Sequence, residues 1–162
     1  FSQMISFPCE LTLHSTPGGL RVFRKPVREI ELLHEGRDFW EAQTLGKNRT
    51  LPLSASGQLF HMVAEISIPE GAKLVFNLRG IPVTLTHSAV ESGHRPAAVQ
   101  GEVRKVEFLI DRTSVETFVN DGEVSSTRYA LPNSSGLSVK AEGGEVMIKG
   151  MTLHPLESAW LH

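Results

Sequence analysis

KVEFLIDRTSVETFVNDGEVSSTRY, residues Lys105–Tyr129, alternates apolar and polar side chains along much of its length. Alternation with a period of two is typical of a strand with one buried face. A two-residue turn at Arg112-Thr113 would set Asp111 opposite Ser114 and keep the mostly apolar set of both strands on one face, whereas a slip of one residue would scatter it. This register predicts the cross-strand pairs Ile110–Val115, Phe108–Thr117 and Val106–Val119.

The second reversal in this stretch lies at Asp121-Gly122. This pair is favoured in type I′ hairpins, where both central residues adopt a positive φ. The turn sets Val124 opposite Val119, on the same face as the earlier apolar residues. The stretch is therefore predicted to be a β-meander of three antiparallel strands.

Similar alternation recurs on both sides of the meander. Segments 10–14 and 20–23 flank the turn signal Thr16-Pro17-Gly18-Gly19, which predicts a hairpin whose second strand ends at Pro26. Further alternating segments lie at 58–68, 74–78, 81–85, 137–141 and 146–153. Short strands with turn signals every eight to twelve residues or so predict an all-β sandwich or barrel. Residues 27–45 fit either a helical turn or short strands.

Composition excludes several classes of function. Sixteen basic and eighteen acidic residues give a net charge of −2 without a basic run, so the electrostatic signature of a nucleic-acid-binding protein is missing. The apolar runs are too short for a transmembrane helix, so no membrane partner is expected. The single cysteine, Cys9, excludes an internal disulfide and a cysteine-based zinc site. No cofactor or metal is predicted.

Residues 1–162 are expected to form one domain, because no repeat or low-complexity segment divides them. The sequence opens on Phe1, without an initiator methionine or a signal peptide. We therefore expect it to be a piece of a longer protein.

Four segments carry a resemblance to a known family: FPCELTL (7–13), PVREIELL (26–33), FLIDRTSVETFVNDGE (108–123) and LHPLESAW (153–160). In this order they resemble the C-terminal β-sandwich module of the family 32 glycoside hydrolases, which include levanases, inulinases and invertases. The resemblance implies a two-sheet antiparallel β-sandwich, jelly-roll or concanavalin-like, that packs against an N-terminal five-bladed β-propeller. It also implies a parent enzyme that hydrolyses fructans or sucrose.

The family's chemistry lies in the propeller, in the motifs N-D-P-N, R-D-P and E-C. Retaining hydrolysis needs two carboxylates about 5 Å apart, and the propeller supplies them. None of these motifs occurs here: Arg37-Asp38 is followed by Phe39, and Cys9-Glu10 reverses E-C in a strand expected to belong to the sandwich. We therefore predict no catalytic residue in this chain and no hydrolysis by the chain alone.

Sugar-binding candidates are Asp111, Arg112, Glu116 and Trp40, because carboxylate and guanidinium groups bind hydroxyls and tryptophan stacks on sugar rings. The alternative role for Asp111 is to cap its turn by accepting a backbone N–H. For Trp40 the equal alternative is docking against the propeller. Trp160 is also a stacking candidate, but so near the end of the chain it is rather expected to close the core or the interface to a neighbouring domain.

The seven histidines lack the close spacing of a metal site, and two of them, His14 and His61, fall on the polar phase of their strands, which predicts solvated side chains.

Three hypotheses follow. The first is an accessory, non-catalytic module that packs on a fructan-hydrolysing propeller and contributes to the cleft or to a homodimer contact. The second is a carbohydrate-binding module that recognises fructan or fructose by itself. The third is a module of an inactive relative. A secreted, extracellular or periplasmic location is expected, because fructans are met outside the cell.

Overall fold

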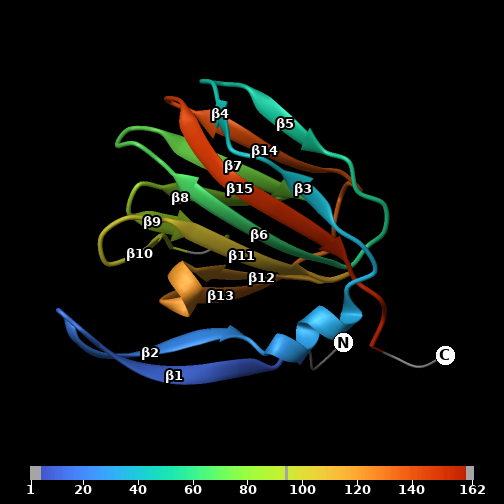
Figure 1. Ribbon diagram of the computed structural model, residues 1–162, viewed down its shortest axis with the longest axis horizontal. Coiled ribbons are helices and arrows are strands. Elements are labelled where there is room, and N and C mark those ends of the chain that lie inside the picture. Colours follow the sequence, from blue (N-terminus) through green and yellow to red (C-terminus); the bar gives the residue numbers. More distant parts are fainter. Residues whose placement is uncertain (1–4, 94, 160–162) are drawn as a thin grey trace.

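The computed structural model describes residues 5–93 and 95–159, which form two antiparallel sheets packed face to face and a separate hairpin (Figure 1). The seven-stranded sheet has the order β13-β12-β11-β6-β15-β3, with β4 also paired to β15, and the six-stranded sheet has the order β10-β9-β8-β7-β14-β5. The expected all-β, two-sheet antiparallel β-sandwich is thus confirmed.

The bounds of the strands in the seven-stranded sheet are β3 Asp38–Trp40, β4 Gln43–Leu45, β6 Phe60–Ser67, β11 Lys105–Ile110, β12 Ser114–Val119, β13 Val124–Tyr129 and β15 Val146–Pro155. Those in the six-stranded sheet are β5 Thr50–Leu53, β7 Lys73–Leu78, β8 Ile81–Thr86, β9 Ala89–Glu91, β10 Ala97–Ala98 and β14 Leu137–Glu142.

The meander β11–β13 has the predicted register. Its cross-strand partners include Ile110↔Val115, Phe108↔Thr117, Val106↔Val119 and Val119↔Val124. The second reversal contains the single 3₁₀ turn η2 (Asn120–Gly122), in which Asp121 and Gly122 have φ of 59° and 94°. Positive φ at both residues is the type I′ geometry that the Asp-Gly pair predicts.

The main core lies between the two sheets and is built from every second residue of their strands. On β6 the inward residues Phe60, Met62 and Ala64 are fully buried. Phe76 of β7 and Phe108 of β11 meet across the core with ring centroids 4.9 Å apart and planes tilted by 56°. Such tilted ring pairs add to the stabilisation that burial of the rings provides.

The N-terminal hairpin, β1 (Cys9–Thr16) and β2 (Gly19–Pro26), forms as predicted and ends at Pro26. The expectation that its first strand belongs to the sandwich is wrong, because β1 and β2 pair only with each other among the described residues. The hairpin runs beside the β13 edge of the seven-stranded sheet (Figure 1).

Residues 27–45, which the sequence leaves undecided, contain the 3₁₀ helix η1 (Arg28–Leu33) and the short strands β3 and β4. Ile30 of η1 packs on Leu109, Phe118 and Leu156 in a second, smaller hydrophobic cluster. Leu109 and Phe118 alternate with the inward residues of the meander, so this cluster lies on the outer face of the sheet. The meander strand β12 is therefore buried on both faces.

Within the described residues, no helix has the length and apolar character needed to cross a membrane.

Candidate functional site

The first turn of the meander carries two of the predicted site residues. Asp111 Oδ1 accepts a hydrogen bond from the backbone N–H of Arg112 at 2.6 Å, and the Asp111 N–H donates to Ser114 O at 2.9 Å. The Asp111 carboxylate thus caps its own turn, which is the alternative role weighed from the sequence. The cap leaves Arg112 exposed at the tip of the turn.

Arg112 lines an open cleft of about 500 Å³. This volume lies within the range of about 300 to 1,000 Å³ that is usual for small-molecule sites. Arg112 Nε donates to Gln58 Oε1 at 3.1 Å, which restricts the orientation of the guanidinium. The other residues that line the cleft are Glu35, Ser56, Gly57, Leu59, Pro155, Leu156, Glu157 and Ser158.

Buried Arg79 joins Gln58, which lines the cleft, to the turn that carries Arg112. Its Nη1 donates to the carbonyl of Gln58 at 3.0 Å and to the carbonyl of Asp111 at 3.3 Å. A guanidinium presents several donors in a fixed plane, so one side chain can bridge two loops. In the sequence Arg79 stands out only as part of the turn pair Arg79-Gly80, and its role was missed because that role depends on contacts far along the chain.

Backbone pairing holds two further segments that line the cleft. The Glu35 N–H donates to Pro155 O at 3.0 Å, and the Glu157 N–H donates to Leu33 O at 2.8 Å. Glu35, Glu157 and Arg112 therefore line the cleft together with Leu59 and Leu156. A lining that combines charged, amide-bearing and apolar residues suits a small polyhydroxylated ligand.

Glu116, another predicted site residue, does not line this cleft. Its carboxylate is fully buried and accepts hydrogen bonds from Arg24 Nη2 at 2.8 Å, the Phe7 N–H at 2.6 Å and Thr127 Oγ1 at 3.2 Å. The Arg24 guanidinium also lies 5.5 Å from the centroid of the Phe118 ring. The carboxylate of Glu116 thus binds the hairpin to the outer face of the meander.

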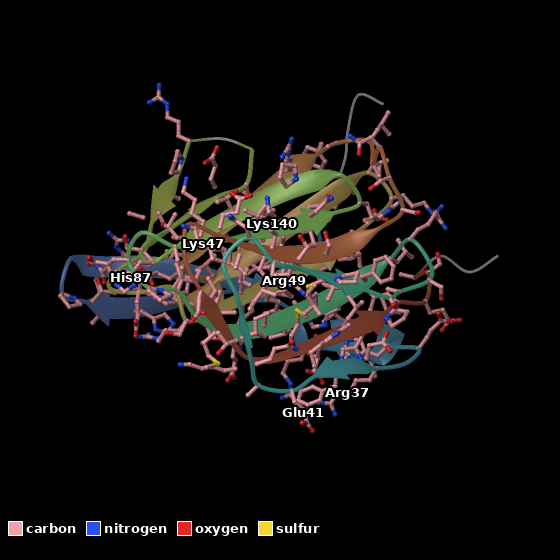
Figure 2. The ribbon with its side chains drawn as sticks, turned by 90° about the horizontal axis from the view of Figure 1, so that it is seen from above. Arg37, Glu41, Lys47, Arg49, His87 and Lys140 are labelled. Carbon is pink, nitrogen blue, oxygen red and sulfur yellow. The ribbon has the colours of Figure 1, made fainter. Side chains whose placement is uncertain are left out.

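Trp40, the fourth predicted residue, is half-buried and packs against the main core. Its cross-strand partner is Met151, a core residue of β15. The adjacent Phe39 points the other way and is 53% exposed, with the guanidinium of Arg37 5.1 Å from its ring centroid. Figure 2, seen from above, places Arg37 near Glu41 at one border of the molecule. Trp160, like His94 and His162, lies outside the described residues.

The two histidine predictions have different outcomes. His14 is exposed, as its strand phase predicts. The prediction that His61 is solvated is wrong, because η1 and the residues after it cover this part of the sheet and His61 is 6% exposed. Across residues 5–93 and 95–159, no three His, Cys, Asp or Glu side chains are grouped closely enough to hold a metal ion.

Comparison with known proteins gives a consistent family. The sequence model described as "Glycosyl hydrolases family 32 C terminal" matches residues 75–155, half of the chain. A levanase from Bacillus subtilis (strain 168) is 28% identical over an alignment that covers 96% of this chain and 27% of the levanase. A sucrose-6-phosphate hydrolase from Staphylococcus xylosus is 25% identical, with 92% and 34% covered.

Solved structures share the fold. The exo-inulinase from Aspergillus awamori superposes with a TM-score of 0.71 at 16% identity, covering 96% of this chain and 36% of that one. The fructan 1-exohydrolase IIa from Cichorium intybus gives 0.68 at 15% identity, with 92% and 40% covered. The chain therefore spans between about a quarter and two-fifths of the length of these four proteins.

Proposed function

The chain belongs to the C-terminal family of the family 32 glycosyl hydrolases, and from this premise we propose that it is the non-catalytic β-sandwich module of a β-fructosidase. In this proposal a separate N-terminal propeller of the same protein hydrolyses fructan or sucrose. The module supports that propeller by packing against it. The proposal extends to the whole protein what the names of its longer relatives state.

The observation that carries the proposal is an uncovered apolar face on the N-terminal hairpin. Leu11, Leu13, Leu20 and Val22 are each between 59% and 69% exposed. Leu13 pairs with Val22, and Leu20 and Leu11 belong to neighbouring pairs of the same phase, so the four side chains share one face. We call these four residues the hairpin face.

The hairpin face lies on the same side of the hairpin as Arg24, which contacts the sandwich. Leu11 pairs with Arg24, whose guanidinium reaches the buried Glu116 from the same side of the hairpin. The base of the hairpin is thus covered by the sandwich, while its outer part meets solvent. Contiguous exposed apolar side chains of this size are typical of a surface that another protein surface covers, and in the proposal the propeller covers it.

The absence of hydrolysis is tested on the chain itself. Purified residues 1–162 are incubated with sucrose, levan and inulin, and released fructose is measured. We expect no release above the buffer control, because Asp111 caps a turn and Glu116 is fully buried and hydrogen-bonded. Turnover at enzyme-like rates would overturn the proposal.

The packing role is tested in the longer protein that the proposal requires. The double variant Leu13→Lys, Val22→Lys places two charges in the interface, and we expect calorimetry to show a lower melting temperature for the propeller. Leu131→Lys is the control, because Leu131 is 82% exposed outside the hairpin. Equal melting temperatures for the double variant and the control would refute docking through the hairpin face.

A second candidate function is recognition of fructan by the module itself, with the ligand in the cleft beside Arg112. The orientation of Arg112 by Gln58 favours it, together with Glu35 and Glu157, which also line the cleft. Isothermal titration with levan oligosaccharides and fructose is the test. We expect weak binding that Arg112→Ala removes and Arg21→Ala, on the hairpin, leaves unchanged. No heat at millimolar ligand would exclude this function.

The proposed substrate also gives the expected location. Fructan polymers are met outside the cell, so we propose that the protein is secreted or periplasmic. Fractionation of the producing cells with an antibody against the chain tests this, and a purely cytoplasmic signal would contradict it.

A further inference from the structure

Three histidines from distant parts of the sequence meet on the outer face of the seven-stranded sheet. His61 of β6 and His154 of β15 are cross-strand partners, and His34 follows η1. The ring of His34 stacks on that of His154 with centroids 3.9 Å apart and planes 9° apart, and it lies 5.1 Å from the ring of His61. We call these residues the histidine cluster.

A chain of hydrogen bonds runs through the cluster to a carboxylate. His34 Nε2 lies 2.9 Å from His61 Nδ1, and His61 Nε2 lies 2.8 Å from Glu107 Oε1 on β11. The carboxylate only accepts, so His61 Nε2 carries a proton and donates it. In a neutral His61 the Nδ1 atom is then an acceptor, and it receives the Nε2–H of His34. One set of tautomers therefore satisfies the whole chain.

The histidine cluster lies where the backbone of residues 34 and 35 pairs with the end of β15 and the residue after it. His34 forms an isolated bridge with Leu156, and the backbone of Glu35 pairs with Pro155. His154 Nδ1 lies 2.6 Å from the carbonyl oxygen of Gly36, so this nitrogen donates a proton. Residues 33–36 comprise the last residue of η1 and the start of the link from η1 to β3, and His34 of the cluster belongs to this segment.

The hydrogen bond between His34 and His61 tolerates one added proton but not two. When the pair of His34 and His61 takes up one proton, the hydrogen bond between the two rings persists. His61 Nδ1 can then donate and the facing nitrogen of His34 accept, and the positive charge lies beside the Glu107 carboxylate. A second proton turns both facing nitrogens into donors at 2.9 Å, which removes the bond. A charge on His34 also faces the stacked ring of His154. Among the neighbouring carboxylates, Glu107 on β11 accepts a hydrogen bond from His61, and Glu31 on η1 acts on His34.

Burial lowers the pKa of His34 from its ordinary value of 6.5, and the positive charges of His154 and His61 lower it further, while Glu31 acts in the opposite direction. When the segment is released, His34 regains the ordinary imidazole pKa. The released state therefore binds more protons once the pH falls below about 6.5, and the docked state loses stability there. Above that pH the stabilisation is fully present.

We propose that the histidine cluster is a pH-sensitive joint that holds residues 33–36 on the sheet at neutral pH and releases them on acidification. Release would free η1 and loosen the hairpin while the sandwich core stays folded. This role does not depend on which substrate the longer protein uses. It concerns only how firmly the hairpin and the sandwich are coupled.

Amide hydrogen exchange of the 162-residue chain at pH 7.5 and pH 5.5 tests the joint. Rates are corrected for the intrinsic pH dependence of exchange. We expect the protection of the Glu35 and Glu157 amides to fall by up to about tenfold per pH unit below 6.5 for each proton taken up on opening. Amides of β7 and β14 should keep their protection. A uniform change along the chain, or no local change, would overturn the proposal.

Two variants separate the joint from a general effect of acid. His34→Gln keeps a side-chain N–H donor for His61 Nδ1 but cannot take up a proton, so the local pH dependence should disappear. His14→Gln is the matched control, because His14 is exposed on the hairpin, and it should retain the wild-type profile. Should His34→Gln fail to fold, the imidazole NMR titration of the wild type decides. A His34 that titrates at or above 6.5 contradicts the proposal.

Discussion

The meander β11–β13 and the hairpin β1–β2 share one kind of sequence pattern and have opposite environments. Both alternate apolar and polar residues around tight turns. In the meander Phe108 and Val119 are fully buried, whereas Leu13 and Val22 of the hairpin are 65% and 59% exposed. Alternation therefore predicts a strand and its faces, but not whether an apolar face is covered.

The difference arises from what lies opposite each face. The inner face of the meander meets the six-stranded sheet, and part of its outer face meets η1 and the base of the hairpin. The hairpin has only two strands, so beyond its base no second layer lies against it among the described residues. A two-stranded hairpin alone is marginally stable in water, so its contact with the meander through Glu116 supports its position.

The largest expected effect comes from deleting a core ring on the meander. Phe108→Ala should lower the free energy of unfolding by about 3 to 5 kcal/mol, because it leaves a cavity beside Phe76. Leu13→Ala on the hairpin should change it by less than about 0.5 kcal/mol in the isolated chain. Urea denaturation of both variants measures the contrast. Comparable losses would mean that the hairpin is as well covered as the meander.

The next effect concerns the contact that joins the two regions. Glu116→Gln removes the buried charge that pairs with Arg24, whose side chain is 26% exposed, and should cost about 2 to 3 kcal/mol. Glu10→Gln is the control, since Glu10 pairs with Lys25 at 3.3 Å on the exposed hairpin and should cost less than about 1 kcal/mol. Equal unfolding free energies for the two variants would remove the role given to Glu116.

A glycine between the two regions gives a smaller effect. A Cβ on Gly122 would collide with the backbone of Arg24, and its φ is +94°. Gly71 has a φ of +81° but open space around the Cβ position, so Gly71→Ala reports the backbone strain alone. Gly71→Ala should cost about 1 kcal/mol. Gly122→Ala should cost more, with faster hydrogen exchange in β2. Matching losses would show that the hairpin moves aside freely.

The smallest expected effect is a gain in stability. Thr117 Oγ1 is buried in the meander and is one of two such side-chain atoms without a hydrogen-bond partner among the described residues. Thr117→Val should raise the free energy of unfolding by about 0.5 to 1 kcal/mol, because it removes an unsatisfied polar atom. Thr127→Val is the matched control, since it deletes a hydrogen bond to Glu116 and should be destabilising by about 1 kcal/mol. A destabilising Thr117→Val would indicate a hidden partner for the hydroxyl.

Much of the fold could be predicted from local sequence. The cross-strand pairs of the meander and the positive φ of Asp121 and Gly122 follow from alternation and turn chemistry, which act over a few residues. The cap formed by Asp111 is likewise a local contact. Residues 27–45 could not be assigned, because the short strands there exist through pairing with β15, more than a hundred residues later.

Local sequence placed single residues but not their distant partners. Arg112 lies at the tip of a predictable turn, and the structure places it in a cleft, while its contact with a sugar stays a prediction. Arg79 was missed, and His61 was expected in solvent, because their partners come from other parts of the chain. Strand phase correctly put His61 on the outer face. It carried no information on the segment that covers this face.

The sequence by itself determined the longer strands outside residues 27–45, the turns between them, the register of the meander and the family. These properties depend on side-chain alternation and on backbone preferences at single turn residues, and both involve only residues that are close together in the sequence. Only the tertiary structure decided that Glu116 is buried beneath the hairpin, that three histidines meet at the segment after η1, and that the hairpin face stays uncovered. These depend on which surfaces are brought together when distant segments pack, and burial and charge are set by those contacts.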